Sequence, residues 1–409
     1  MRQALFAPRR CSLSFLPGEP EMPDDTIDVL AAVRDLAPSI SARSAEIESE
    51  RRLPLDLLDQ LIAAGCFRML TPRSHGGLEV DLLLSMEIIE TIAAADGATG
   101  WTVMIGSESP MLLALLPRSR FDQIYANTPD VIVGGGFAPG GQAAAGAGGY
   151  LVSGRWAFAS GCQHTQWLFG NCVVTENGQP RAGLLPGSRE IRAMLFRSDQ
   201  ARIIDTWEVS GLRGTGSHDI EVKNLRVPTD DSLDIFMGQS CVPGALYKAP
   251  VVSFALHIGA VGVGIARHAL ADIIALVQTN KKRLYTGSAI ADSPLFHHRL
   301  AQAETSLRAA RELLMAESRA VWQSSLVGRS PTPSETARVV GSVAWAARTA
   351  ASIVDTCYTA GGGTALYSSS PLQRHLRDIH TLTQHAAVNE AMLARAGAFL
   401  IGRSPDFTF

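Results

Sequence analysis

The stretch Gly149-Tyr-Leu-Val-Ser-Gly-Arg-Trp-Ala-Phe-Ala-Ser-Gly-Cys-Gln-His164 has the pattern of a strand buried on one side. The apolar residues expected on one face of this strand are Tyr150, Val152, Trp156 and Phe158. This period of two is typical of a half-buried strand, and Ser160-Gly161 ends it. A second stretch, Thr206-Trp-Glu-Val-Ser-Gly-Leu-Arg-Gly-Thr-Gly-Ser-His-Asp-Ile220, enters a Gly-rich bend and then resumes the alternation. Together they predict a small β-domain with a ligand site at its rim.

The flanking regions carry helical patterns. Pro54 is placed to begin a helix that Gly65 ends, and another helix is expected over about 82–95. Farther on, apolar residues recur every seven positions, as in antiparallel bundles; they are Leu300, Leu307, Leu314 and Val321. We therefore predict four regions: a mobile N-terminal extension (1–23), a helical domain (24–129), a central β-domain (130–240) and a C-terminal helical bundle (241–409).

Composition favours a small-molecule partner. The chain has 409 residues and a net charge of −3, and its Lys and Arg residues form no basic stripe, so we expect neither nucleic acid nor a membrane surface as partner. The apolar run 251–277 is interrupted by His257, Arg267, His268 and Asp272 and is predicted to be a core helix. The six cysteines show no regular spacing, which favours a reducing, cytoplasmic location without disulfides.

Several familiar motifs are absent from the sequence. It contains no phosphate-binding G-x-x-x-x-G-K-S/T loop, no G-x-S-x-G elbow, and no complete dinucleotide-binding glycine fingerprint. His375, His380 and His385 are five residues apart, which is about 140° around a helix, so they do not converge on one face. We expect no metal site.

A β-region between two helical regions, with these motifs, resembles the acyl-CoA dehydrogenase superfamily over about residues 25–402. Within it, the chain is similar to the branch of reduced-flavin-dependent monooxygenases. The resemblance implies an α+β fold with an N-terminal helical domain, a central β-barrel and a C-terminal four-helix bundle, assembled as a homotetramer.

In that family the segment before Ser160 lines the flavin ring. An isoalloxazine needs an apolar wall on one face and polar groups at its N5/O4 edge, and the resemblance assigns these parts to Phe158 and Ser160. The alternative is structural: Trp156 and Phe158 fill the barrel core and Ser160 caps a turn.

The resemblance also implies sites for the flavin phosphates. Arg213, Thr215 and Ser217 lie in the Gly-rich bend, where backbone amides and hydroxyls suit an anion, although a plain β-turn is the alternative. Arg283 matches an arginine that reaches a neighbouring subunit's flavin, or it belongs to a solvated helix end.

A glycine turn completes the implied cofactor site. Gly362 and Gly363 match the turn at which the family lets the distal part of the cofactor approach the backbone.

The dehydrogenase reaction lacks its base here. Acyl-CoA dehydrogenases use a glutamate where this chain has Ser369, and residues 356–376 contain no carboxylate. The family's second known location also has none, because residues 235–271 lack Asp and Glu. Abstraction of an α-proton by a carboxylate is therefore unsupported.

A histidine takes this place instead. The monooxygenase branch has a flavin-facing histidine at the position of His385, and an imidazole can take or give a proton during oxygen transfer. The alternative is a buried helix histidine. His164, just after the predicted flavin wall, is a second catalytic candidate and otherwise a surface hydrogen-bonding residue. Ser107, Glu108 and Ser109 stand where some relatives carry a further histidine.

These features predict the oxygenase component of a two-component flavin monooxygenase. It would receive reduced flavin (FADH2 or FMNH2) from a separate reductase and use O2, through a C4a-hydroperoxyflavin, to oxygenate an aromatic or heteroaromatic small molecule. The alternatives are an acyl-CoA dehydrogenase-like flavin dehydrogenase or oxidase, and a non-catalytic helical oligomer with a degenerate flavin site.

Overall fold

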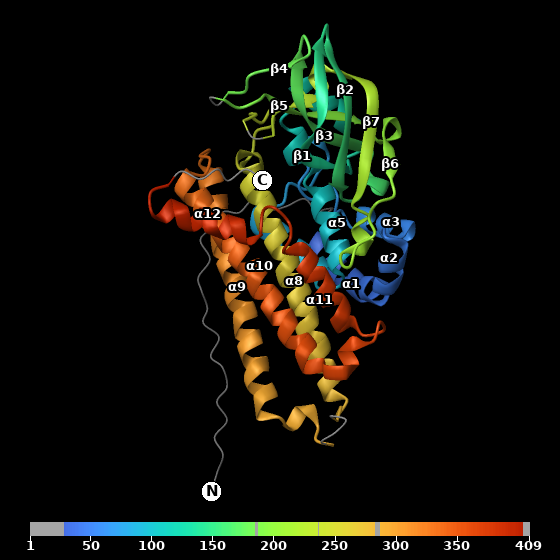
Figure 1. Cartoon of the computed structure of the whole chain (residues 1–409), viewed down its shortest axis with the longest axis vertical. Coiled ribbons are helices and arrows are strands. Elements are labelled where there is room, and N and C mark those ends of the chain that lie inside the picture. Colours follow the sequence, from blue (N-terminus) through green and yellow to red (C-terminus); the bar gives the residue numbers. More distant parts are fainter. Residues whose placement is uncertain (1–27, 185–186, 236, 283–286, 404–409) are drawn as a thin grey trace.

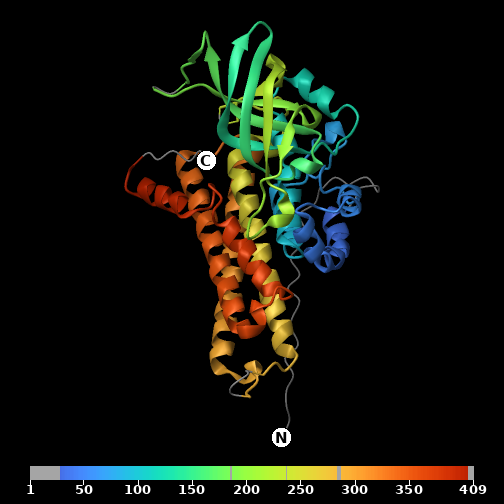
Figure 2. The same cartoon turned by 45° about the vertical axis from the view of Figure 1, so that its right-hand side comes forward.

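A computed structural model describes residues 28–184, 187–235, 237–282 and 287–403 of the chain. The β-sheet lies at one end, the long C-terminal helices extend away from it, and the N-terminal helices lie below the sheet and beside the bundle (Figures 1 and 2). The predicted extension 1–23 and Arg283 lie outside the described residues.

Local sequence signals explain the N-terminal helices. Helix α3 follows Pro54, as predicted, and the chain leaves it through Gly65 with φ of 82°. Asp81 caps α4 by accepting a hydrogen bond from the Leu84 amide at 2.7 Å. The helices are α1 (Val29–Ala42), α2 (Ser44–Glu50), α3 (Leu55–Ala63), α4 (Leu82–Ala93), α5 (Gly97–Ser107), α6 (Ser109–Leu113) and α7 (Arg118–Tyr125).

One eight-stranded sheet forms the central region. The strands are β1 (Val133–Gly146), β2 (Gly149–Ala159), β3 (Trp167–Glu176), β4 (Gln179–Pro180), β5 (Ile191–Arg197), β6 (Arg202–Ile204), β7 (His218–Pro228) and β8 (Ser232–Leu233). Their order is β6-β7-β2-β1-β3-β5-β8, with β4 paired to β3. Trp156 fills the core of this region, and its Nε1 donates to the Asn171 carbonyl at 2.7 Å.

The predicted barrel is not formed, because the sheet is open. Its two ends are β6 and β8, which have three and two residues. Strands this short offer few backbone groups for a ladder, and no pairing joins them within the described residues. The fold is therefore an acyl-CoA dehydrogenase-like arrangement of helical regions around an open sheet.

The alternation predicted for β2 fails at Phe158. The pairing of β2 with β7 is irregular between Trp156 and Ala159, and Phe158 has φ of 63°. This bulge turns the Phe158 side chain outward, where it is 71% exposed. Trp156 is core, as the structural alternative proposed, whereas Phe158 is not.

Among the described residues, five α-helices follow the sheet: α8 (Pro250–Gln278), α9 (Pro294–Leu326), α10 (Pro333–Gly361), α11 (Pro371–Leu382) and α12 (Glu390–Leu400). The sevenfold pattern predicted a buried face of α9, and Leu307, Leu314 and Val321 are buried. Residues 251–278 of α8 are apolar and long enough to cross a bilayer, but 61% of their most apolar window is buried inside the structure. This agrees with the core helix predicted from sequence.

Candidate active site

Four side chains form a chain of hydrogen bonds at the rim of the sheet. Trp101 Nε1 donates to Ser160 Oγ at 3.1 Å, and the Ser160 and Ser217 hydroxyls are 2.7 Å apart. Ser217 and Thr215 are also 2.7 Å apart, and Thr215 donates to the Leu212 carbonyl at 2.8 Å. All four side chains are buried. The sequence-predicted residues Ser160, Thr215 and Ser217 are thus brought together.

The two ends of this chain set the direction of every bond in it. An indole N–H only donates and a carbonyl only accepts, and each hydroxyl has a single hydrogen. Because Thr215 donates to Leu212, it accepts from Ser217, which in turn accepts from Ser160. The hydroxyl hydrogen of Ser160 is therefore donated to Ser217, and the Ser160 oxygen can form a further hydrogen bond only as an acceptor.

Trp101 also joins Ser160 to His385. The indole and imidazole rings meet edge to face with centroids 5.4 Å apart. Sequence reasoning did not identify Trp101, although its helix carries a signal: Gly97 and Gly100 let α5 pack closely. An added Cβ would lie 2.9 Å from Ile265 at Gly97 and 2.6 Å from Ala93 at Gly100.

His385 is a neutral imidazole held in one tautomer. Burial lowers its pKa to about 4. Its Nδ1 accepts a hydrogen bond from the Ala387 amide at 3.2 Å, so in the neutral ring the hydrogen is on Nε2. The Nε2–H group is therefore a hydrogen-bond donor near neutral pH.

The Gly-rich bend is fastened to α11, the helix that precedes His385. Asp378 accepts from the Leu212 amide at 2.6 Å, and Arg377 donates to the Ser210 carbonyl. Burial, with the nearby Asp96 carboxylate adding to it, raises the pKa of Asp378 to about 7. A Cβ on Gly211 would lie 2.1 Å from a backbone oxygen of α11, so the close approach requires glycine.

Other predicted residues lie outside this cluster. Arg213 folds back on its own bend, donating to the Val209 carbonyl at 2.9 Å. Gly362 and Gly363 are exposed where α10 ends, and an added Cβ would meet nothing within 4 Å at either one. Helix α11 (Figure 1) is about 18 Å long at 1.5 Å per residue, and it lies in the chain between this glycine turn and His385.

His164 ties the sheet region to the N-terminal helices. Its Nε2 accepts from the Leu53 amide at 3.1 Å, and burial lowers its pKa to about 4. The surface position that sequence suggested as an alternative is incorrect, because the residue is buried. Glu108 is also buried, and it pairs with His257 Nδ1 at 2.7 Å. His257 Nε2 lies 2.9 Å from the Ser85 hydroxyl.

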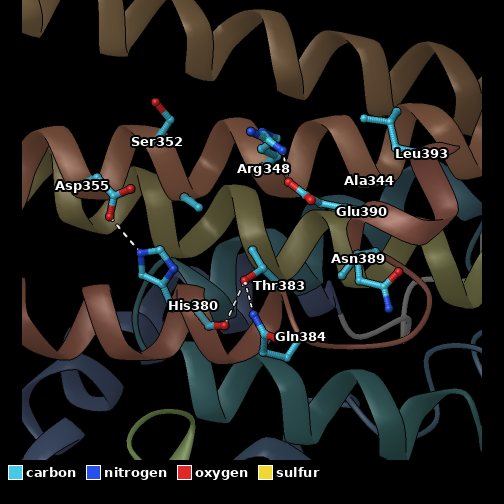
Figure 3. Close-up of a pocket in the computed structure, with 12 residues that line it drawn as sticks. Ala344, Arg348, Ser352, Asp355, His380, Thr383, Gln384, Asn389, Glu390 and Leu393 are labelled. Atoms are coloured by element: carbon cyan, nitrogen blue, oxygen red, sulfur yellow. Dashed lines mark hydrogen bonds and ion pairs between the residues drawn. The ribbon is translucent and has the colours of Figure 1, made fainter.

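A pocket of about 430 Å³ lies elsewhere, between α10, the end of α11 and α12 (Figure 3). It contains a His380–Asp355 pair at 2.8 Å and the Arg348–Glu390 pair. None of its lining residues belongs to the Ser160 chain. None of the site residues predicted from sequence lines this pocket.

Comparison with known proteins agrees with the fold. The acyl-CoA dehydrogenase N-terminal and C-terminal domain families match residues 23–116 and 256–390. Indole-3-acetate monooxygenase of Pseudomonas putida is 34% identical, with 92% of this chain and 93% of that protein aligned. The FADH(2)-dependent resorcinol hydroxylase oxygenase component of a Rhizobium species is 30% identical, with coverage of 92% and 94%.

A solved structure extends the likeness to three dimensions. The crystal structure of 3-HSA hydroxylase from a Rhodococcus species superposes with a TM-score of 0.85 at 28% identity, covering 94% of this chain and all of that one. The chain therefore belongs to the acyl-CoA dehydrogenase superfamily and, within it, to the flavin-dependent monooxygenases.

Proposed function

We propose that this protein is the oxygenase component of a two-component system in the cytoplasm. It takes reduced FAD or FMN from a separate reductase and inserts one atom of O2 into an aromatic or heteroaromatic small molecule. The relatives named for indole-3-acetate and resorcinol support this substrate class. The observation that carries the proposal is the directed hydrogen-bond chain ending at Ser160 beside Trp101 and His385.

The residues present fit a flavin ring. Phe158 holds an aromatic side chain in solvent from a backbone with φ of 63°, a conformation that costs free energy and is concentrated at functional sites. Its ring meets Trp207 edge to face at 6.1 Å. We assign Phe158 to the apolar wall and Ser160 to the N5 edge. The reduced flavin, when bound, supplies the activation of O2 and the transfer of one oxygen atom.

The direction of the hydroxyl chain favours the reduced cofactor. Reduced flavin carries a hydrogen on N5, whereas oxidised flavin presents only a lone pair there. Because Ser160 has its own hydrogen committed to Ser217, its oxygen is suited to receive that N–H. An oxidised ring would instead compete for the Ser160 hydrogen, at the cost of the Ser160–Ser217 bond.

His385 is assigned to hydrogen-bond donation. Its Nε2–H can stabilise negative charge that develops on oxygen during transfer. The sequence suggested that His385 gives or takes a proton; the role we assign instead is donation of a hydrogen bond from Nε2–H, without transfer of that proton. We assign His164 to positioning, since it fastens the segment after Ser160 to the backbone of Leu53.

The distal part of the cofactor requires more than one chain in this proposal. Gly362 and Gly363 are exposed and separated from His385 by the length of α11. In a homotetramer the glycine turn of one subunit would serve the flavin of another, with Arg213 of the bend and Arg283 near the phosphates.

Binding of the two redox forms of the cofactor tests this function. Affinities for oxidised FAD and FMN, and anaerobically for their reduced forms, are measured by fluorescence titration in wild type, Ser160→Ala and Ser318→Ala. Ser318 is a matched control, a buried serine that donates to a helix carbonyl at 2.8 Å in α9. We expect tighter binding of the reduced form, a smaller preference in Ser160→Ala and an unchanged one in Ser318→Ala. Equal affinity for both forms in wild type contradicts the proposal.

A further inference from the structure

Two histidines and an aspartate converge between α8 and α11, away from the residues assigned to the flavin. Asp272 and His268 are one helical turn apart on α8, and His375 projects from α11. One donor atom from each of the three lies within 4.8 Å of the other two. The sequence argument against a metal compared His375 only with histidines downstream of it, and the partners come from another helix.

The spacing suits ligands of a single ion. His375 Nε2 is 2.7 Å from Asp272 Oδ2, and His268 Nε2 is 3.7 Å from the same oxygen. Two ligands about 2.1 Å from one ion lie roughly 3.0 to 3.4 Å apart at octahedral to tetrahedral angles. The observed distances fall on either side of this range. Small side-chain rotations would therefore place all three around one centre.

The His268 imidazole is incompletely satisfied by the described part of the chain. Its Nδ1 is buried without a hydrogen-bond partner there. Its Nε2 has two long contacts, one of 3.5 Å to the Ser41 hydroxyl and one of 3.7 Å to Asp272 Oδ2. The side chain is 13% exposed, so water does not readily replace the missing partners. The His375 ring is 4.5 Å away between centroids. A bound ion would give the His268 ring the strong contact that it lacks.

We propose that His268, Asp272 and His375 bind one divalent first-row transition metal ion, with solvent completing its coordination. Two imidazoles and a carboxylate are ligands that such metals accept, whereas Mg²⁺ and Ca²⁺ prefer oxygen alone. The cationic side chain of Arg374 acts electrostatically on Asp272. This nearby positive charge opposes any bound cation, so binding depends on bonds from the three ligands.

The metal would fasten α11 to α8. These helices pack side by side, and α11 also carries Asp378, which holds the Gly-rich bend, and leads to His385 (Figure 1). The ion would thus stabilise the position of α11, the helix that holds the Gly-rich bend and leads to His385, and it would take no part in oxygen transfer. This inference stands independently of the proposed monooxygenase function.

The test is titration of the untagged full-length protein, after chelator treatment and dialysis, with Zn²⁺ by calorimetry and with Co²⁺ by visible absorbance. Asp272→Asn is the decisive variant, because asparagine keeps a hydrogen-bond acceptor for His375 while removing the anionic ligand. His268→Gln is the second variant. His380→Gln is the control, since His380 lies on α11 like His375 and pairs with Asp355 of α10, and no third ligand joins that pair within the described residues.

We expect one ion per chain in wild type and in the control, and binding weakened at least tenfold in Asp272→Asn and His268→Gln. Circular dichroism of each metal-free protein establishes that it is folded, and Asp272→Asn decides alone if His268→Gln is not. Absence of stoichiometric Zn²⁺ binding in wild type overturns the proposal, as does wild-type affinity in Asp272→Asn.

Discussion

Removing the Ser160 hydroxyl is predicted to lower the free energy of unfolding more than removing the Trp101 indole N–H that donates to it. In Ser160→Ala, the buried Trp101 Nε1–H loses its acceptor. A buried donor left unpaired costs about 1 to 3 kcal/mol in unfolding free energy. In Trp101→Phe the donor itself is gone, while the Ser160 hydroxyl keeps Ser217 as partner. We expect that hydrogen-bond loss to cost about 1 kcal/mol, apart from any change in packing.

The double variant separates these contributions. With phenylalanine at 101 no unpaired donor exists, so Ser160→Ala should cost about 1 to 2 kcal/mol less there than in wild type. The assay is urea unfolding followed by circular dichroism, with equal m-values required across the four proteins. Ser160→Ala combined with Trp156→Phe is the control cycle, because Trp156 donates to Asn171 and not to Ser160. Costs that add within about 0.5 kcal/mol in the Trp101 cycle would refute the reasoning.

Three further predictions concern the surroundings of the site. Burial lowers the pKa of His164 to about 4 from 6.5, so the stability that the neutral imidazole contributes is complete above pH 6.5 and is lost as the pH falls toward 4, by about 3 kcal/mol at most. His164→Gln should flatten the plot of unfolding free energy against pH over this range, measured by urea unfolding. An unchanged slope in the variant would show that His164 is not the titrating group. Glu108→Ala leaves the buried His257 Nδ1 without its partner and should lower the unfolding free energy by about 3 kcal/mol. Glu108→Gln should lower it by less than half of that in the same assay. Equal losses in the two variants would argue against the Glu108–His257 pair. Gly211→Ala should lower the melting temperature and weaken flavin binding, because the added Cβ meets the α11 backbone. Gly363→Ala should leave the melting temperature unchanged, because its Cβ meets nothing. Equal melting temperatures in the two variants would show that Gly211 does not pack tightly against α11.

Local patterns predicted the parts of the fold that depend on neighbouring residues. Pro54 and Gly65 mark the start and the end of a helix, because their backbone preferences act within a single turn. The sevenfold spacing in α9 reports a buried face directly, and Leu314 is 2% exposed. The resemblance assigned Ser160 to the ring edge and Ser217 to a phosphate, and it did not predict that the two hydroxyls meet.

Features that depend on distant pairing escaped prediction. Phe158 keeps the alternation of its strand in sequence, but the bulge against β7 turns it outward. The open sheet follows from the lengths of its end strands, which the alternation does not specify. Trp101 is 59 residues from Ser160, and the glycines of its helix indicate close packing but not this hydrogen-bond partner. For the same reason His375 gave no sign of its contact with Asp272, 103 residues away.

Oxygen incorporation from ¹⁸O2 tests the central claim most directly. The protein is mixed with anaerobically reduced FAD or FMN and with indole, indole-3-acetate or resorcinol, and ¹⁸O2 is then admitted. We predict that mass spectrometry finds a product from at least one of these aromatic compounds that carries one ¹⁸O atom, with the yield reduced at least tenfold in His385→Ala. Flavin oxidation without labelled product from any of them, together with reduction of bound oxidised flavin by an acyl-CoA thioester, would contradict the account and favour a dehydrogenase.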